Sequence, residues 1–307
     1  MDNILADSVS VIIPSYGREE SILRCVNSVV LSDREAIANL EIVIVSSGYD
    51  QSLYSELARV VVSYGHSFCH IDPGFIQSTS RSRNLGAEAS SSEYLYFLDD
   101  DNTVASNTIT GLYQSLVKWE DACMVAPVMF YGDAPDTIWC AGGYRTKLLM
   151  RTIFRREIPT PIPERLESDD FPNCFMVRRR EFNAIGGFDE DQFPQMFEES
   201  DLAKRLKYLT GCRSFCVPEY SVWHHMSMAR YRRYHVDSPE KAFLMARQRI
   251  RFLNMYGSQT QKWVARLGGN WLYLLYYSLI ICSAPRKTRW TIWRAYLLGT
   301  LKSGQLK

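Results

Sequence analysis

The sequence predicts an α/β fold: a doubly wound, mainly parallel sheet with helices on both faces, followed by a C-terminal helical extension. Two observations carry this prediction. Short β-branched runs alternate with segments whose apolar residues recur at helical spacing, as far as residue 98. Polar or flexible residues follow the predicted strands, where wound sheets bind their ligands. Because right-handed crossovers connect strand, helix and parallel strand, this order favours a wound sheet.

The elements follow one another regularly. Residues 9–13 (VSVII) are a β-branched run that Pro14 closes, and residues 40–45 (LEIVIV) are a second run, which ends in two serines and a glycine. In chain order, the sequence predicts strand 9–13, helix 22–30, strand 40–45, helix 53–61, strand 66–71, helix 80–89 and strand 94–98.

Composition narrows the function classes. The chain has 307 residues, of which 46% are apolar and 22% charged, so it can bury a core and disorder is not expected. Its 35 basic and 34 acidic residues nearly cancel, which disfavours nucleic acid as a partner. Residues 1–17 carry acids where an export signal needs basic residues, so we expect a cytoplasmic location.

The eight cysteines predict buried, free thiols in a reducing compartment and no disulfide framework. Most of them lie within apolar runs. Cys212 and Cys216 are the closest pair, but no second cysteine pair or histidine stands at the spacing of a zinc finger, so we expect no zinc site there.

Three consecutive carboxylates, Asp99, Asp100 and Asp101, follow the fourth predicted strand. Clustered carboxylates repel one another unless a cation lies among them, and Mg²⁺ or Mn²⁺ prefers oxygen ligands. The pair Asp99 and Asp101 therefore predicts a divalent metal that bridges to a diphosphate. The alternative is an acidic turn in which Asp101 or Asn102 only caps a helix.

Six motifs occur in a fixed order along the chain: VSVIIPSYGR (9–18), SRSRNLGAEA (80–89), FLDDD (97–101), RRREFNAIGGFDED (178–191), FEESDLAKRLK (197–207) and VWHHMS (222–227). With this order and spacing, residues 8–250 resemble the inverting family 2 glycosyltransferases, nucleotide-sugar enzymes of the GT-A fold, and within them the rhamnosyltransferase-like branch.

The resemblance implies a donor, UDP-, dTDP- or GDP-linked, and a metal that joins its two phosphates. The residues that it places on the donor are Pro14, Ser15, Tyr16, Arg18, Ser46, Arg83, Asn84, Asp99 and Asp100. The residues that it places on the metal are Asp99, Asp101 and one of His224 and His225. For Arg83 the alternative is a solvated charge on a helix, and either histidine could instead be packed or solvated.

The general base is predicted near residue 199. Glu198, Glu199 and Asp201 begin a helical pattern, where the helix dipole favours ionised carboxylates. In the family, the second acid of a pair is the base, and the matching residue is Glu199; Glu198 and Asp201 are the other candidates. The alternative is that all three acids only cap the helix. The resemblance also places Asn173 and Cys174 beside the acceptor, and the 186–191 turn (GGFDED) at the acceptor wall.

One position departs from the family pattern. Relatives commonly carry an aspartate where this chain has Ser46 in 45-VSSGY-49, and that aspartate holds the base or ribose. A hydroxyl can bond a base edge but cannot pair with a cation, so base preference can differ. Asp50 is a candidate substitute.

The C-terminal region has another character. We expect a catalytic domain at 1–226 and a helical region at 227–307, which includes the basic segment 230–235 and the apolar run 271–284. That run is too short to span a bilayer, but Trp and Tyr beside Lys and Arg suit a helix in the membrane interface. The alternative is a helical cap on the catalytic domain or on a second subunit of a homo-oligomer.

The sequence thus predicts a metal-dependent inverting glycosyltransferase, a hexosyl- or deoxyhexosyltransferase acting on a glycan or polyprenyl-linked acceptor. A nucleotide-sugar-binding protein without transferase activity is the alternative. A nucleotidyltransferase would need a glycine-rich loop with Arg and Lys after the first strand, which PSYGREE does not supply.

Overall fold

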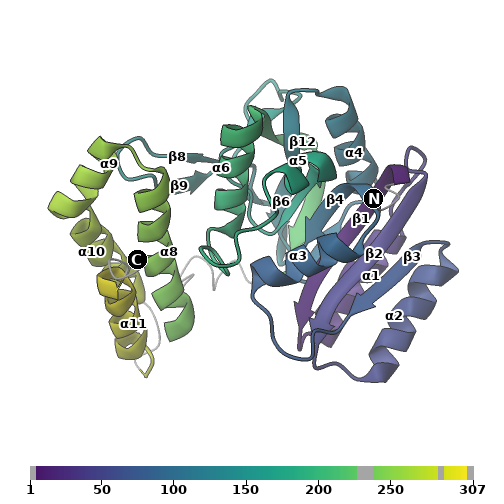
Figure 1. The fold of residues 1–307 in the computed structure, drawn as a ribbon, viewed down its shortest axis with the longest axis horizontal. Helices are drawn as coiled ribbons and strands as arrows, with labels where there is room; N and C mark the ends of the chain where they lie inside the picture. The colour runs from purple at the N-terminus through teal and green to yellow at the C-terminus, as the bar shows by residue number, and fades with distance from the viewer. Residues whose placement is uncertain (1–4, 227–237, 283–286, 303–307) are drawn as a thin grey trace. The chain divides into compact units, whose positions relative to one another are not determined.

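The computed structural model describes residues 5–226, 238–282 and 287–302 (Figure 1). The described residues form two compact units. The first comprises residues 5–144, 154–194 and 198–225, and the second comprises 145–153, 195–197 and the described residues from 226 onward. The basic segment 230–235 lies outside the described residues.

The first unit contains the wound sheet that the sequence predicts. Its strands β3, β2, β1 and β4 are adjacent in this order, and all pair in parallel. Helix α3 packs against β1 and β2, and Figure 1 shows it lying across these strands. The elements are β1 Leu5–Tyr16, α1 Glu19–Val30, β2 Asn39–Ser47, α2 Gln51–Ser63, β3 Ser67–Ile71, α3 Thr79–Ala89 and β4 Ser92–Leu98. Each predicted strand and helix of this half is confirmed.

Beyond β4 the sheet becomes mixed. Strand β11 (Cys174–Arg178) pairs antiparallel with β4 and with β6 (Ala122–Tyr131), and β12 (Arg213–His224) is parallel to β6. The remaining elements of this unit are β5 Asn102–Val104, α4 Thr108–Lys118, β7 Ala134–Cys140, β10 Leu166–Glu167, α5 Arg179–Ala184 and α6 Glu198–Thr210. The pairing of Leu98 with Cys174 places Asn173 beside Asp99, where the backbone N–H of Asp99 donates to the Asn173 carbonyl.

An aromatic cluster fills the core behind the end of β4. The ring of Phe97 lies 5.4 Å from Phe175, 5.4 Å from Phe182 and 5.1 Å from Phe188, measured between centroids. Phe188 reaches this cluster because Gly186 and Gly187 turn the chain with φ of +77° and +71°, values that side chains rarely adopt. The 186–191 turn is thus present, with Phe188 packed in the core beneath it.

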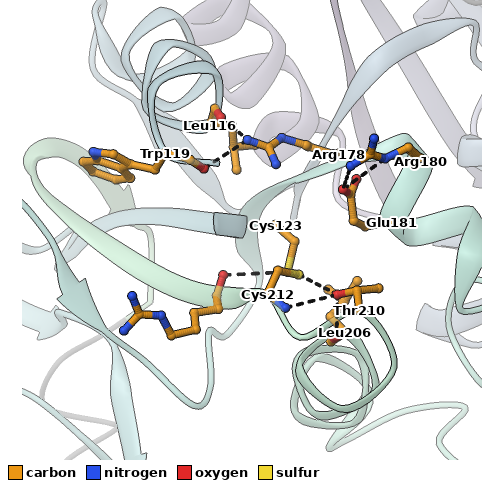
Figure 2. The surroundings of a disulfide bond; sticks show 10 residues. Leu116, Trp119, Cys123, Arg178, Arg180, Glu181, Leu206, Thr210 and Cys212 are labelled. Carbon is orange, nitrogen blue, oxygen red and sulfur yellow. Dashed lines mark hydrogen bonds and ion pairs between the residues drawn. A yellow bond between two sulfur atoms is a disulfide. The ribbon is translucent and has the colours of Figure 1, made fainter. Parts of the chain in front are cut away.

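The prediction that all the cysteines are free was wrong for two of them. Cys123 and Cys212 form a disulfide across 89 residues of sequence, and Figure 2 shows their surroundings. The two cysteines meet because Arg213 at the start of β12 pairs with Ala122 at the start of β6, so the neighbouring residues become adjacent. Cys216, the cysteine closest to Cys212 in sequence, is buried and free.

The second unit is helical apart from its share of the β8–β9 ribbon. It contains α8 Pro239–Tyr256, α9 Gln259–Val264, the π-helix η1 Ala265–Gly269, α10 Asn270–Ile281 and α11 Arg289–Lys302; the ribbon pairs β8 Gly143–Arg145 with β9 Thr152–Phe154. It has a small core of its own, formed by Ala242, Ala246, Leu274, Ile281, Ile292 and Tyr296. Among the described residues, no helix has the length and apolarity that crossing a bilayer requires.

Candidate active site

The carboxyl ends of β1 and β4 meet at one edge of the sheet. Ser15, near the end of β1, donates its hydroxyl to Asp100 at 2.5 Å, and its oxygen lies 2.6 Å from the hydroxyl of Tyr49. Asp100 is fully buried, and burial raises its pKa to about 7 despite the neighbouring Arg18. The alternative of a helix cap at Asp101 or Asn102 fails, because Asn102 begins strand β5.

Arg18 binds the second and third aspartates together. Its guanidinium forms ion pairs with Asp100 and, at 2.9 Å, with Asp101. The backbone N–H of Arg18 donates to the Tyr49 hydroxyl at 2.9 Å, which fixes the loop that carries it. The side chain of Arg18 is 49% exposed, so it can also reach an anion in solvent.

Asp101 faces His224 on the neighbouring strand end. Nε2 of His224 lies 3.4 Å from Oδ1 of Asp101, a buried oxygen for which no hydrogen bond is found. Burial alone would raise the pKa of Asp101, but His224 and Arg18 hold it below its ordinary value. His225 instead directs its ring toward Thr103, with Nε2 2.9 Å from the hydroxyl oxygen, so the two histidines are not equivalent.

A divalent cation fits at Asp101 and His224. A carboxylate oxygen without a hydrogen bond and an imidazole nitrogen are acceptable ligands of Mn²⁺, and the carboxylate is one for Mg²⁺. Among the described residues no group of three or more Asp, Glu, His or Cys side chains could hold a metal, so the other ligands would come from a diphosphate and water. The balance of charges also favours a bound cation, because carboxylates outnumber guanidinium groups at the site. Arg18 and Arg83 face Asp99, Asp100, Asp101, Glu198 and Glu199.

Arg83 joins Asp99 to the predicted base. Its Nη2 donates to Asp99 and its Nη1 to Glu199, each at 2.9 Å. The arginine is fully buried, with its guanidinium 5.5 Å from the centroid of the Phe188 ring. The alternative of a solvated charge is therefore wrong. Asp99 points to this arginine, whereas Asp101 points to His224.

The three acids of helix α6 separate into two groups. Glu198 and Glu199 lie 3.7 Å and 2.9 Å from Nη1 of Arg83, and burial raises the pKa of both carboxyl groups. A raised pKa suits a carboxylate that takes up a proton near neutral pH. Asp201 instead pairs with Arg205 one turn along the same helix, at 2.7 Å. The structure thus places Glu198 and Glu199 at the site and directs Asp201 away from Arg83.

Residues 10–186 of the chain match the family described as Glycosyl transferase family 2. The chain belongs to glycosyl transferase family 2. A curated relative, the glycosyltransferase GlyA of Streptococcus pneumoniae serotype 4, is 25% identical over 117 residues, which are 38% of this chain and only 16% of that protein.

Two solved structures share the GT-A fold with this family 2 chain. GalNAc-T7, solved with UDP, GalNAc and Mn²⁺, superposes with a TM-score of 0.64 at 15% identity over 84% of this chain and 49% of its own. The mannosyltransferase PcManGT of Pyrobaculum calidifontis, solved with GDP-Man and Mn²⁺, superposes with a TM-score of 0.56 at 13% identity over 99% of this chain and 90% of its own. The predicted fold class is confirmed.

Two further predicted residues of this family 2 chain bond to different segments: Asn84 contacts the 186–191 turn, and Asn173 contacts Glu199. The side chain of Asn84 bonds the backbone of Phe188 and donates to Glu190 at 2.7 Å, so it anchors the 186–191 turn. Asn173 has a left-handed φ of +46°, and its backbone N–H faces Glu199 at 3.4 Å. Cys174 is fully buried with its sulfur 2.8 Å from the Tyr96 hydroxyl, so its thiol belongs to the core.

The departure at Ser46 has a structural counterpart. The buried hydroxyl of Ser46 lies 3.4 Å from Nε2 of His70, and the His70 ring stacks on Tyr54 at 3.6 Å. Asp50 is exposed at the start of α2, where its side chain makes no capping bond. The position at which the resemblance implies a carboxylate thus carries a hydroxyl group beside an imidazole. The first strand contributes half-buried Pro14 and exposed Tyr16, whose ring would lie 3.3 Å from a Cβ at Gly48.

Sequence reasoning missed two residues near these strand ends. Tyr49 bonds both Ser15 and Arg18, and His70 stands next to Ser46 on the neighbouring strand β3. Both follow or end a predicted strand on the sheet's binding edge, and this position was the available signal.

Proposed function

We propose that this chain is an inverting glycosyltransferase that moves a hexosyl or deoxyhexosyl group from a nucleotide-diphosphate-sugar to a glycan or lipid-linked glycan. One observation carries the proposal: Glu199 and Asp99 are held by the two nitrogens of one buried guanidinium, that of Arg83. Single-displacement transfer requires a base close to the bound donor, because the acceptor oxygen must lose its proton as it attacks. Glu199 would be that base, beside Asp99, which would contact the donor.

The residues divide the work. Glu199 would accept the proton of the acceptor hydroxyl. The acceptor oxygen would then bond to the anomeric carbon while the bond from that carbon to the diphosphate breaks. Asp101 and His224 would hold the Mg²⁺ or Mn²⁺, which, when bound, neutralises charge on the diphosphate. Arg18 would bind phosphate oxygens from the solvent side. Asn84 would anchor the 186–191 turn, and Asn173 would help to position Glu199.

Further parts of the proposal concern the donor, the metal and the setting of the reaction. A UDP, dTDP or GDP donor agrees with UDP and GDP-Man in the structural neighbours, and Mn²⁺ is bound in both. We further propose that the chain belongs to the rhamnosyltransferase-like branch and acts in polysaccharide biosynthesis. It would work as a homo-oligomer or as a peripheral protein on the cytoplasmic face of a membrane. Retention of both Glu198 and Glu199 disfavours a binding protein without transfer activity.

Turnover tests the proposal. The purified chain is incubated with Mn²⁺ and a panel of nucleotide sugars, and release of the nucleoside diphosphate is followed with candidate acceptors and without them. We expect acceptor-stimulated release that Glu199→Gln abolishes, and a product anomer opposite to that of the donor by NMR. Retention of the donor anomer, or equal turnover by Glu199→Gln, would reject the mechanism.

A further inference from the structure

The helical unit exposes an apolar stripe along α9, η1 and α10. Every fourth residue on this stretch is apolar, and each of these side chains is between 59% and 79% exposed: Trp263, Leu267, Trp271, Leu275 and Leu279. Leu272 is exposed beside Trp271, whereas the partly exposed Tyr276 ring is contacted by Arg151. Soluble monomers rarely leave so many large apolar side chains together in water, so this surface, which we call the Trp–Leu face, needs an explanation.

Helix α10 cannot bury all of its apolar residues within the helical unit. Tyr273, Leu274 and Ile281 already pack inward, and the segment NWLYLLYYSLII has no charged residue with which to cover the rest. A helix that is apolar all round belongs to a buried core or to a membrane environment. With 12 residues α10 is too short to span a bilayer, so in a membrane environment it would lie along the surface.

Charge indicates what covers the face. Twelve of the 35 basic residues and none of the 34 acidic residues follow Glu240, so residues 241–307 carry a formal charge of +12 and residues 1–240 carry −11. Lys262 and Arg266 stand within the face's own helices, next to Trp263 and Leu267. Tryptophan beside basic side chains suits the headgroup region of a bilayer that contains anionic lipid.

We propose that the Trp–Leu face binds the surface of an anionic lipid bilayer. The acidic remainder of the chain would be repelled by the same surface, so attachment is confined to the helical unit. Among protein partners, a second copy would bring two strongly basic surfaces together, which disfavours self-association through this face. The inference rests on the peripheral membrane location in the proposed function, to which it assigns a surface and a lipid class, and it does not depend on sugar transfer.

Vesicle flotation of the full chain tests the proposal without nucleotide or turnover. We expect binding to vesicles of phosphatidylcholine with phosphatidylglycerol, weaker binding to phosphatidylcholine alone, and release at high salt. The double variant Trp271→Glu with Leu275→Glu should lose at least about tenfold in binding, since two large apolar side chains no longer leave water. Tyr208→Glu with Leu209→Glu, at exposed apolar positions on α6, is the matched control.

Two further readouts keep the result decisive. Circular dichroism shows whether the variant remains folded, and Lys262→Glu with Arg266→Glu tests the electrostatic part without changing an apolar side chain. Absence of wild-type binding to either vesicle, or equal losses in the control, would overturn the proposal. So would a wild-type dimer that the Trp271 and Leu275 changes convert to a monomer without altering vesicle binding, which would assign the face to a second copy.

Discussion

The carboxylates of Asp99 and Glu199, one hundred residues apart in sequence, share one guanidinium. Arg83 donates Nη2 to Asp99 and Nη1 to Glu199, each at 2.9 Å, and it is fully buried. Removal of a buried cation would leave both carboxylates unpaired. The same side chain therefore positions Asp99 and Glu199, the carboxylates that we propose as donor contact and base.

Replacement of the base should separate binding from chemistry. Glu199→Gln keeps the side-chain size and should lower kcat by about 10²- to 10⁴-fold, because the acceptor proton has no carboxylate to receive it. Donor affinity, measured by calorimetry, should change little. Glu198→Gln serves as the comparison. A larger loss in kcat for Glu198→Gln than for Glu199→Gln would show that Glu198 is the base.

The pH dependence of activity should report Glu199. Burial raises its pKa above 4.5 while Arg83 opposes the rise, so kcat/KM should fall as pH drops through that raised pKa. Arg83→Met removes the opposing charge and should move this acid limb to higher pH. Arg81→Met, on the same helix but partly exposed, is the control and should leave the limb in place.

The same Arg83→Met variant should lose stability in a pH-dependent way. Without the guanidinium, the buried carboxyl groups hold their protons more tightly in the folded state, so the free energy of unfolding falls as pH rises through their raised pKa values. Urea unfolding at two pH values should show a loss of about 3 to 5 kcal/mol at the higher one and a smaller loss at the lower. Equal losses at both would indicate that Arg83 acts only through packing.

The two adjacent histidines should respond differently. His224→Gln removes the imidazole that faces Asp101 and that we propose as a metal ligand. It should weaken Mn²⁺ binding in the presence of the diphosphate by at least about 10- to 100-fold, the loss that is typical even when a residue that only supports a ligand is replaced. His225→Gln changes a ring that faces Thr103 and should weaken it far less. Titration of Mn²⁺ by its paramagnetic resonance signal compares them, and equal losses would contradict the assignment.

The disulfide should stabilise the sheet. Cys212→Ser opens an 89-residue loop and should lower the free energy of unfolding by about 2 to 5 kcal/mol. Cys282→Ser, at an exposed free cysteine, should not. Mass spectrometry of alkylated protein, purified without reductant, checks the bond itself. Since disulfides persist mainly in oxidising compartments, complete alkylation of Cys123 and Cys212 would favour the cytoplasmic location.

Local patterns predicted the parallel half of the sheet, because each strand and helix up to Leu98 has its own periodicity. The mixed half depends on long-range pairing: the contact of β11 with β4 leaves no local trace in sequence. The same holds for Cys123 and Cys212, which pair through the register of β6 and β12. Motif positions predicted Glu199 and Arg83 as site residues, but not that they bind each other.

The choice between His224 and His225 shows a second limit. His224 is the last residue of β12, and His225 follows the strand, so the two side chains point in different directions. The sequence alone does not fix where the strand ends, so it could not distinguish the two histidines.

We propose that the edge formed by β1, β2 and β4 binds a nucleotide-diphosphate-sugar together with a divalent cation. Thermal unfolding with Mn²⁺ and a panel of UDP-, dTDP- and GDP-sugars tests it most directly, since a ligand that binds only the folded state raises Tm. We predict that one nucleotide class raises the Tm of the wild type and of Glu199→Gln, and that Asp101→Asn loses this increase. No increase for the wild type with any nucleotide and metal would contradict the claim.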